Sequence, residues 1–240
     1  LVDLITDKEK TYEAVMRLGV VTDTQDMTGT ILSQTEQISV TEKEVKEAAE
    51  SFLGEQLQIP PMYSALKVNG KKLYELAREG KTVERKPRPV HFYQIEILEI
   101  NLPLVRYRVV CSKGTYIRTL CHDMGEKLGC GAAMESLVRT KVGKFELKDA
   151  ITLAQAEEAV KSGAIQDKVL GIEEILGEYP RICCKEEGDR LLANGNPLPQ
   201  GVVSGCEKQG WIRMCSSGGA FAGVYQWDER RFLYFPVKMF

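Results

Sequence analysis

The stretch CSKGTYIRTLCHDMGEKLGCGA, residues 111–132, combines residue types that could do chemistry. Tyr116 and Arg118 stand where a predicted strand passes into a predicted helix, with glycines on both sides. A cation in the first turn of a helix opposes the helix dipole, at a cost of roughly a few tenths of a kcal/mol or more. We therefore expect an anionic group close to Arg118. An exposed arginine paired with Asp123 or Glu126 of the same helix is the simpler alternative.

A second candidate for chemistry is the stretch VTDTQDMTG, in which Asp23 and Asp26 could act as paired carboxylates. Gly29 follows them closely, and the combination of Asp with Gly is typical of a turn. We interpret both aspartates as turn residues and do not assign them a catalytic role.

The composition excludes several classes of protein. The chain of 240 residues is 43% hydrophobic and 28% charged, which is typical of a folded globular protein. The sequence contains neither an apolar run of the roughly 18 residues that span a membrane nor a signal-peptide pattern. Seven cysteines without a CxxC pair, and two histidines, make a zinc site or a disulfide framework improbable. We expect a cytoplasmic protein that needs no cofactor, no metal and no membrane, and the sequence indicates no obligatory protein partner.

Hydrophobic periodicity predicts the elements that would position Tyr116 and Arg118. Residues 10–19 alternate between apolar and polar side chains, as a half-buried strand does. Thr41 and Glu44 have the spacing of a capping box and open an amphipathic helix. A second helix ends at Gly80, and two strands are predicted at 90–100 and 104–112.

The helix that carries Arg118 is predicted to begin after Thr115 as N-cap and to end at Gly129. Residues 149–176 read as two short acidic helices, and short strands are predicted around 211–214, 221–227 and 232–237. We therefore expect an α+β fold with a mixed, largely antiparallel sheet and flanking helices. The predicted domains are 1–177 and a small β domain at 178–240.

The charges are segregated along the chain, although the net charge is only −2. Residues 65–90 and 106–144 each contain eight basic against three acidic side chains, whereas residues 146–178 are acidic. Segregation of this kind can create a basic face that attracts a polyanion. Two solvated helix surfaces would explain the same charges.

Three segments together resemble one family, the bacterial TruB-type tRNA pseudouridine synthases. They are DKEKTYEAVMRLGVVTDTQDMTG at 7–29, QIPPMYSALKVNGKKLYELAREG at 58–80, and CSKGTYIRTLCHDMGEKLGCGAAMESLVRTKVGKF at 111–145. Their order and spacing also match the family, and the match covers residues 7–145. The C-terminal β domain is similar in size and position to the family's PUA-like RNA-binding module.

The resemblance implies a reaction: the T-loop uridine of tRNA is isomerised to pseudouridine without cofactor or metal. The glycosidic bond from C1′ to N1 is broken, and the uracil turns and rejoins C1′ through C5. The base must first leave its stack. By the same resemblance, Tyr12 stacks on the flipped uracil and is a candidate for the proton transfer at C5. Tyr116 contacts the substrate, Arg118 pairs with the catalytic aspartate, and Leu137 packs against the base.

The resemblance also implies an RNA-binding path. Lys67 would contact the substrate, and Lys71, Lys72, Arg78 and Arg139 would contact the RNA backbone. Lysine and arginine contacts to phosphate set affinity and register rather than sequence preference.

The family's nucleophilic aspartate belongs to a Gly-x-Leu-Asp-Pro-x-Ala-Thr-Gly motif upstream of Tyr12, and this sequence contains no Asp-Pro dipeptide. The first residue is Leu1 rather than methionine, so we expect a longer parent protein that carries the motif, and a chain that as written does not catalyse. A module that binds or folds the T-arm of tRNA without chemistry is the main alternative. A related synthase with another RNA target is a third possibility.

Overall fold

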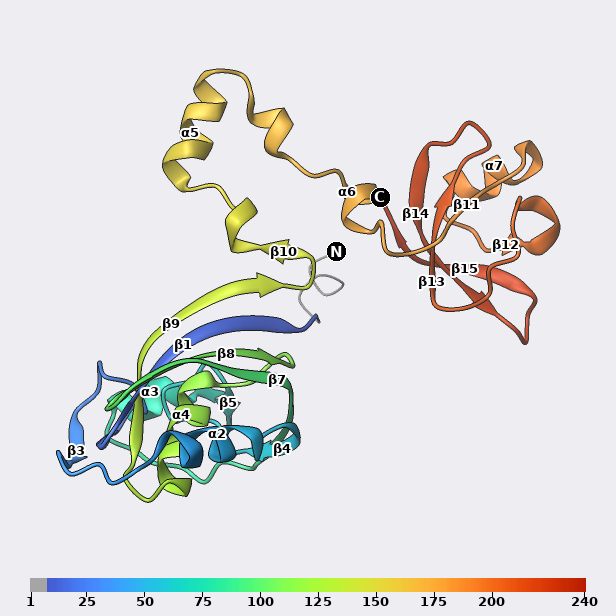
Figure 1. Cartoon of the computed structure of the whole chain (residues 1–240). Coiled ribbons are helices and arrows are strands. Elements are labelled where there is room, and N and C mark those ends of the chain that lie inside the picture. Colours follow the sequence, from blue (N-terminus) through green and yellow to red (C-terminus); the bar gives the residue numbers. More distant parts are fainter. Residues whose placement is uncertain (1–7) are drawn as a thin grey trace. The chain divides into compact units, whose positions relative to one another are not determined.

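The computed structural model describes residues 8–240, which form two compact units, one ending at Ala150 and one beginning at Ile151 (Figure 1). Each unit contains its own sheet and its own hydrophobic core. No helix among the described residues is long and apolar enough to cross a membrane.

The first unit is built on a six-stranded sheet in which every neighbouring pair is antiparallel. In spatial order, the strands are β10 (Phe145–Glu146), β9 (Ala132–Val142), β1 (Lys10–Leu18), β8 (Leu104–Cys111), β7 (Arg88–Asn101) and β4 (Gly54–Gln58). The predicted strands at 10–19, 90–100 and 104–112 are confirmed as β1, β7 and β8. Residues that pair directly in such a sheet point to the same face, so the register decides which side chains meet.

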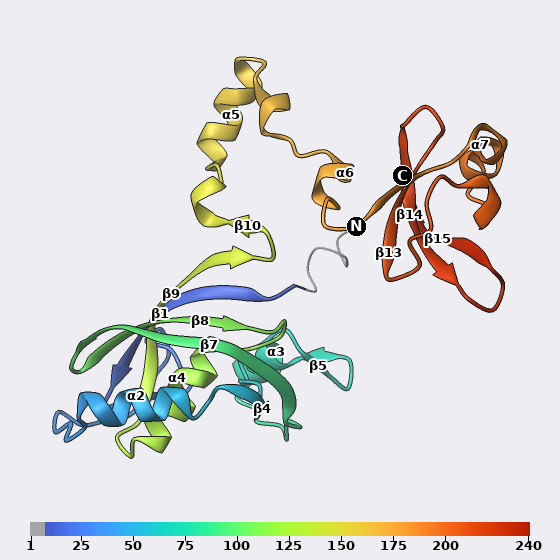
Figure 2. The ribbon, with the colours of Figure 1, turned by 45° about the vertical axis from the view of Figure 1, so that its right-hand side comes forward.

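Helices α2 (Glu42–Glu50) and α4 (Ile117–Lys127) lie on the same face of this sheet (Figures 1 and 2). The alternating residues Ala14, Met16 and Leu18 of β1 are buried on that face, as the periodicity predicts. The core is completed mainly by Val45, Phe92, Val105, Tyr107, Val109, Leu120 and Met124. The predicted capping box of α2 is confirmed, because the Thr41 and Glu44 side chains each bond the backbone of the other residue.

The beginning of α4 differs from the prediction by one residue. Tyr116, not Thr115, is the N-cap, because the Thr115 hydroxyl donates a hydrogen bond of 2.9 Å back to the carbonyl of Ser112. The predicted end is confirmed: Leu128 is the C-cap, and Gly129 follows with a φ of 73°.

Helix α4 also approaches the start of β9 more closely than side chains normally allow. A Cβ atom at Gly125 would lie 2.1 Å from the backbone nitrogen of Ala132. The Gly125 carbonyl accepts a hydrogen bond of 3.0 Å from the backbone N–H of Gly131. Only glycine fits this contact, which holds the helix directly against the strand.

Smaller elements complete the first unit. They are β2 (Val20–Thr22), β3 (Ile31–Gln34), β5 (Lys67–Val68), β6 (Lys71–Lys72), α3 (Leu73–Arg78) and a 3-10 helix at Leu147–Asp149. Residues 60–88, here called the basic segment, have a small core of their own around Met62, Leu73 and Leu76.

The second unit contains a five-stranded sheet whose first pair is parallel and whose other pairs are antiparallel. In spatial order, its strands are β11 (Arg181–Cys183), β13 (Trp211–Cys215), β14 (Phe221–Asp228), β15 (Leu233–Met239) and β12 (Leu198–Pro199). Its helices are α5 (Leu153–Lys161), α6 (Ile172–Ile175), α7 (Glu186–Ala193) and 3-10 turns at Ile165–Lys168 and Gln200–Val202. The predicted α+β class and the three C-terminal strands are therefore confirmed.

Candidate functional site

Arg118 forms an ion pair with Asp26, which lies 92 residues away in sequence. The Arg118 Nη1 atom is 2.9 Å from Asp26 Oδ2, and the side chains are 27% and 13% exposed. The expected anion near Arg118 is therefore present. It comes from another part of the chain, so the alternative of a partner within the same helix, Asp123 or Glu126, is wrong.

Asp26 is held by its own turn through the second carboxylate oxygen. Oδ1 accepts hydrogen bonds from the backbone N–H of Thr28 at 3.0 Å, from the Thr28 hydroxyl, and from the Thr24 hydroxyl at 2.9 Å. Burial by itself would raise the pKa of Asp26. The hydrogen bonds from Thr28 and Thr24 and the charge of Arg118 outweigh it, so the pKa lies below its usual value of 3.8. Asp26 is therefore ionised near neutral pH.

The turn that carries Asp26 is itself fastened to β9 and α4. The Met27 N–H donates to the carbonyl of Met134 at 2.9 Å, and the Met134 N–H donates to the carbonyl of Gln25 at 3.0 Å. Gln25 adopts a φ of 64°, which is uncommon for a residue with a side chain. Its amide oxygen accepts a hydrogen bond of 2.7 Å from the hydroxyl of Thr119 in the first turn of α4. Asp26 and Arg118 are thus positioned by bonds on both sides of the ion pair.

Tyr12, Arg139 and Leu137 meet on the face of the sheet that carries α4. Tyr12 of β1 pairs with Arg139 of β9, and Ala14 pairs with Leu137. Burial is the main reason that the pKa of Tyr12 is raised, followed by Cys111, while Arg139 opposes the shift. The phenol therefore stays protonated at neutral pH and can donate a hydrogen bond. Leu137 is 39% exposed, which leaves an apolar side chain open beside it.

Tyr116 is half-buried at the N-cap of α4, two residues before Arg118. The structure thus pairs a carboxylate with a guanidinium at the start of α4, and it places a protonated phenol and an exposed leucine on the face of the sheet that carries α4. A carboxylate kept ionised in such a position can act as a nucleophile or base, or can orient the arginine.

The sequence analysis missed two residues of this site. Asp26 was interpreted only as a turn residue, and its local conformation is indeed a turn. The expected anion beside Arg118 was the signal that could have identified it. The other is Gln58, which bonds the backbone of Tyr116, and nothing in its local pattern marks it.

The predicted RNA-contacting residues Lys67, Lys71, Lys72 and Arg78 all lie in the basic segment. Lys67 lines a hollow of about 320 Å³ together with Arg85, Lys86 and Arg88. Lys72 and Arg78 each lie 5.3 Å from the centroid of the Tyr74 ring. Arg139, the fifth predicted RNA contact, lies instead opposite Tyr12.

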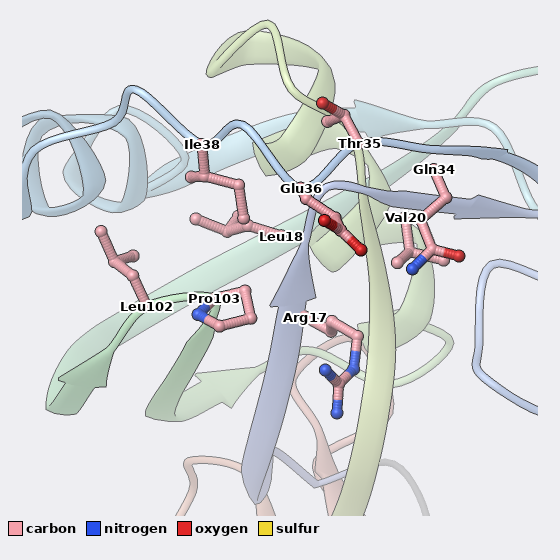
Figure 3. Close-up of a pocket in the computed structure, with 9 residues that line it drawn as sticks. All are labelled: Arg17, Leu18, Val20, Gln34, Thr35, Glu36, Ile38, Leu102 and Pro103. Carbon is pink, nitrogen blue, oxygen red and sulfur yellow. The ribbon is translucent and has the colours of Figure 1, made fainter.

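A further pocket, of about 430 Å³, lies at the far end of β1 (Figure 3). It is lined by Leu18, Ile38 and Pro103, with Arg17 at its rim. Arg17 is paired with Glu135 at 2.7 Å. Six residues of extended strand separate Tyr12 from Leu18, or about 20 Å. This pocket is therefore remote from Tyr12.

Comparison with known proteins shows the family of the chain. The profile of the TruB family pseudouridylate synthases, N-terminal domain, matches residues 1–117, and the profile of the tRNA pseudouridylate synthase B C-terminal domain matches residues 118–176. The chain belongs to the TruB family. Its members are RNA-modifying isomerases, and the resemblance read from the three sequence segments is confirmed.

Curated relatives extend over most or all of the chain. A tRNA pseudouridine synthase B of Lachnoclostridium phytofermentans is 46% identical over 100% of this chain and 82% of its own length. A synthase of the same name from Dehalococcoides mccartyi is 43% identical over 100% of this chain and 79% of its own length. For the synthase B of Clostridium tetani, 46% identical, the match covers 81% of this chain and 66% of the relative.

Solved structures show the same fold. An H/ACA RNP bound to a substrate RNA containing 2′-deoxyuridine contains a chain that matches with a TM-score of 0.68 at 20% identity, over 100% of this chain and 68% of that one. A Cbf5-Nop10-Gar1 complex contains another, with a TM-score of 0.68 at 23% identity, over 99% of this chain and 68% of that one. These likenesses confirm the pseudouridine-synthase fold.

Proposed function

We propose that this chain forms the base-binding and RNA-binding parts of a synthase that converts the T-loop uridine of tRNA to pseudouridine. The observation that carries the proposal is the ion pair of Arg118 with Asp26, together with Tyr12 and Leu137 on the face of the sheet that carries α4. The names of the curated relatives, tRNA pseudouridine synthase B, support tRNA as the substrate class. The reaction breaks the bond from C1′ to N1 and forms one from C1′ to C5. The C5 hydrogen leaves as a proton and N1 takes up a proton, so that the product is an isomer of uridine.

Each site residue has a proposed role. Tyr12 stacks on the flipped uracil and moves the proton at C5. Tyr116 and Leu137 hold the base, and Arg118 keeps a catalytic carboxylate ionised and oriented. Lys67, Lys71, Lys72, Arg78 and Arg139 contact the RNA, the first four through the basic segment and Arg139 beside Tyr12. Residues 1–177 act as the synthase domain and 178–240 as a PUA-like RNA-binding domain in the cytoplasm.

The nucleophile is the open part of the mechanism. We propose that it is the aspartate of the Gly-x-Leu-Asp-Pro-x-Ala-Thr-Gly motif, which does not occur in these 240 residues. In that case Asp26 orients Arg118 from one side while the nucleophile meets it from the other. The chain by itself then binds tRNA without isomerising it.

The test is release of tritium from T-loop RNA labelled at C5 of the target uridine. It compares the chain with an extended chain, in which a segment that carries a Gly-x-Leu-Asp-Pro-x-Ala-Thr-Gly motif is placed before Leu1. We expect release from the extended chain alone and RNA binding by both. Release by the unextended chain would identify another nucleophile, with Asp26 the first candidate. Binding without release by either would support the alternative of a T-arm binding module.

A further inference from the structure

Gln58, the last residue of β4, makes two hydrogen bonds to the backbone of a single residue, Tyr116. Its Nε2 donates to the Tyr116 carbonyl at 3.0 Å, and its Oε1 accepts from the Tyr116 N–H at 2.8 Å. The two residues are 58 positions apart, and Gln58 is only 4% exposed. A buried amide that satisfies one donor and one acceptor on the same residue fixes the orientation of both adjacent peptide planes.

The bonded residue is the N-cap of α4, whose own side chain makes no capping bond. The Tyr116 carbonyl also accepts the first helical bond, from the N–H of Leu120 at 3.2 Å. Gln58 therefore acts on the first turn of the helix that carries Arg118. Gln25 accepts a hydrogen bond from Thr119 in the same turn.

We propose that Gln58 is a positioning residue for the candidate site: its amide clamp on Tyr116 aligns the Tyr116 ring with the substrate base and the Arg118 guanidinium with its carboxylate. This inference rests on the proposed function. Gln58 also lies two residues before the basic segment, whose Pro60 carbonyl accepts a hydrogen bond of 3.1 Å from Arg85. The clamp thus joins the RNA-contacting segment to the helix that carries Arg118.

The test uses Gln58→Glu and Gln58→Met, with Gln56→Glu as the matched control on the same strand. The Gln56 amide reaches only the Ser51 carbonyl, at 3.4 Å. A glutamate at position 58 keeps an acceptor but turns the donor into an oxygen that faces the Tyr116 carbonyl, and methionine removes both bonds without adding charge. In the extended chain, we expect both variants to lower the single-turnover rate about 10- to 100-fold, with RNA affinity changed less than about threefold.

The pH profile separates positioning from a general loss of structure. A buried carboxyl that faces a carbonyl has a raised pKa, and its protonated form again presents a donor and an acceptor. The rate deficit of Gln58→Glu should therefore shrink several-fold between about pH 8 and pH 6. The deficits of Gln58→Met and Gln56→Glu should not change. A deficit in Gln58→Glu that is independent of pH, or an equal loss of affinity and rate, would overturn the proposal.

Hydrogen exchange at the Tyr116 amide gives a readout that does not require catalysis. We expect exchange of this one amide to become about 10- to 100-fold faster in both Gln58 variants and to stay unchanged in Gln56→Glu. If the unmodified extended chain releases no tritium, the proposed function is wrong, and this result says nothing about the clamp by Gln58. Hydrogen exchange at the Tyr116 amide then tests the clamp by Gln58 independently, and an unchanged exchange rate in the Gln58 variants rejects the clamp.

Discussion

The candidate site and the basic segment both rely on cations, but they hold them in different ways. Arg118 is mostly buried and paired with Asp26 at 2.9 Å, and the turn that carries Asp26 is hydrogen-bonded to β9 and to α4. Lys67, Lys86 and Arg88 are exposed around an open hollow. Chemistry at a base needs atoms held to within fractions of an ångström, whereas attraction to phosphates needs charge within reach. We therefore expect the first region to set the rate and the second to set the affinity.

Arg118→Met is the substitution with the largest expected effect on the difference between the two regions. It removes the guanidinium but keeps a side chain of similar length, so Asp26 loses its ionic partner. We expect the single-turnover rate of the extended chain to fall on the order of 1,000-fold, because oriented charge at the reacting centre is lost. RNA affinity should change less than about threefold, since phosphate contacts are untouched. Equal losses of rate and affinity would show that Arg118 serves binding.

The two cores provide the next contrast. Leu120 is fully buried in the main core, and Leu73 is 1% exposed in the small core of the basic segment. We expect Leu120→Ala to lower the free energy of unfolding of the first unit by about 3 kcal/mol. Leu73→Ala should instead loosen residues 60–88 locally, which hydrogen exchange detects as faster exchange confined to that segment. Global unfolding of equal size in both variants would mean that the segment is not separately organised.

The basic segment should control the salt dependence of binding. In Lys71→Ala/Lys72→Ala, two of the proposed contacts to the RNA backbone would be lost, so the slope of log affinity against log salt should become shallower by about 2. The single-turnover rate at saturating RNA should stay within about twofold of the unmodified value, because neither residue is proposed to contact the base. Lys46→Ala, on the exposed side of α2, is the matched control and should leave the slope unchanged.

The smallest expected effect concerns pH. Because the pKa of Asp26 is lowered in the folded state, its contribution to stability is complete above the ordinary value of 3.8 and is lost as pH falls through the lower folded-state pKa. The difference in unfolding free energy between the unmodified chain and Asp26→Asn should therefore narrow below about pH 4, by less than about 1 kcal/mol. A difference that widens in acid would show that Asp26 is not ionised in the folded protein.

Local sequence pattern was enough to predict the helices and strands and to identify the family. The alternation in β1 and the Thr41–Glu44 capping box depend on neighbours in sequence, and both are confirmed. Thr115 as N-cap was wrong because its hydroxyl has a nearer acceptor at Ser112.

The site required contacts that sequence spacing does not encode. Asp26 has the hydrogen bonds of a turn on one oxygen, and its other oxygen reaches Arg118 across 92 residues. The sequence around Gln58 does not indicate its role either, because both of its hydrogen-bond partners are backbone atoms of a distant residue. Such residues become visible only once the strands are in register.

The contact at Gly125 fixes the orientation of α4 and thereby the position of Arg118. Gly125 is the point where the helix rests on the backbone at the start of β9, and Arg118 lies seven residues, or about 10 Å, along the same axis. We expect one added methyl group at this contact to tilt the helix and to move the Arg118 guanidinium away from Asp26, although the substitution touches neither residue. A survey of inactivating substitutions should therefore find position 125 as intolerant as the site residues themselves. A substitution there changes none of the side chains around the base.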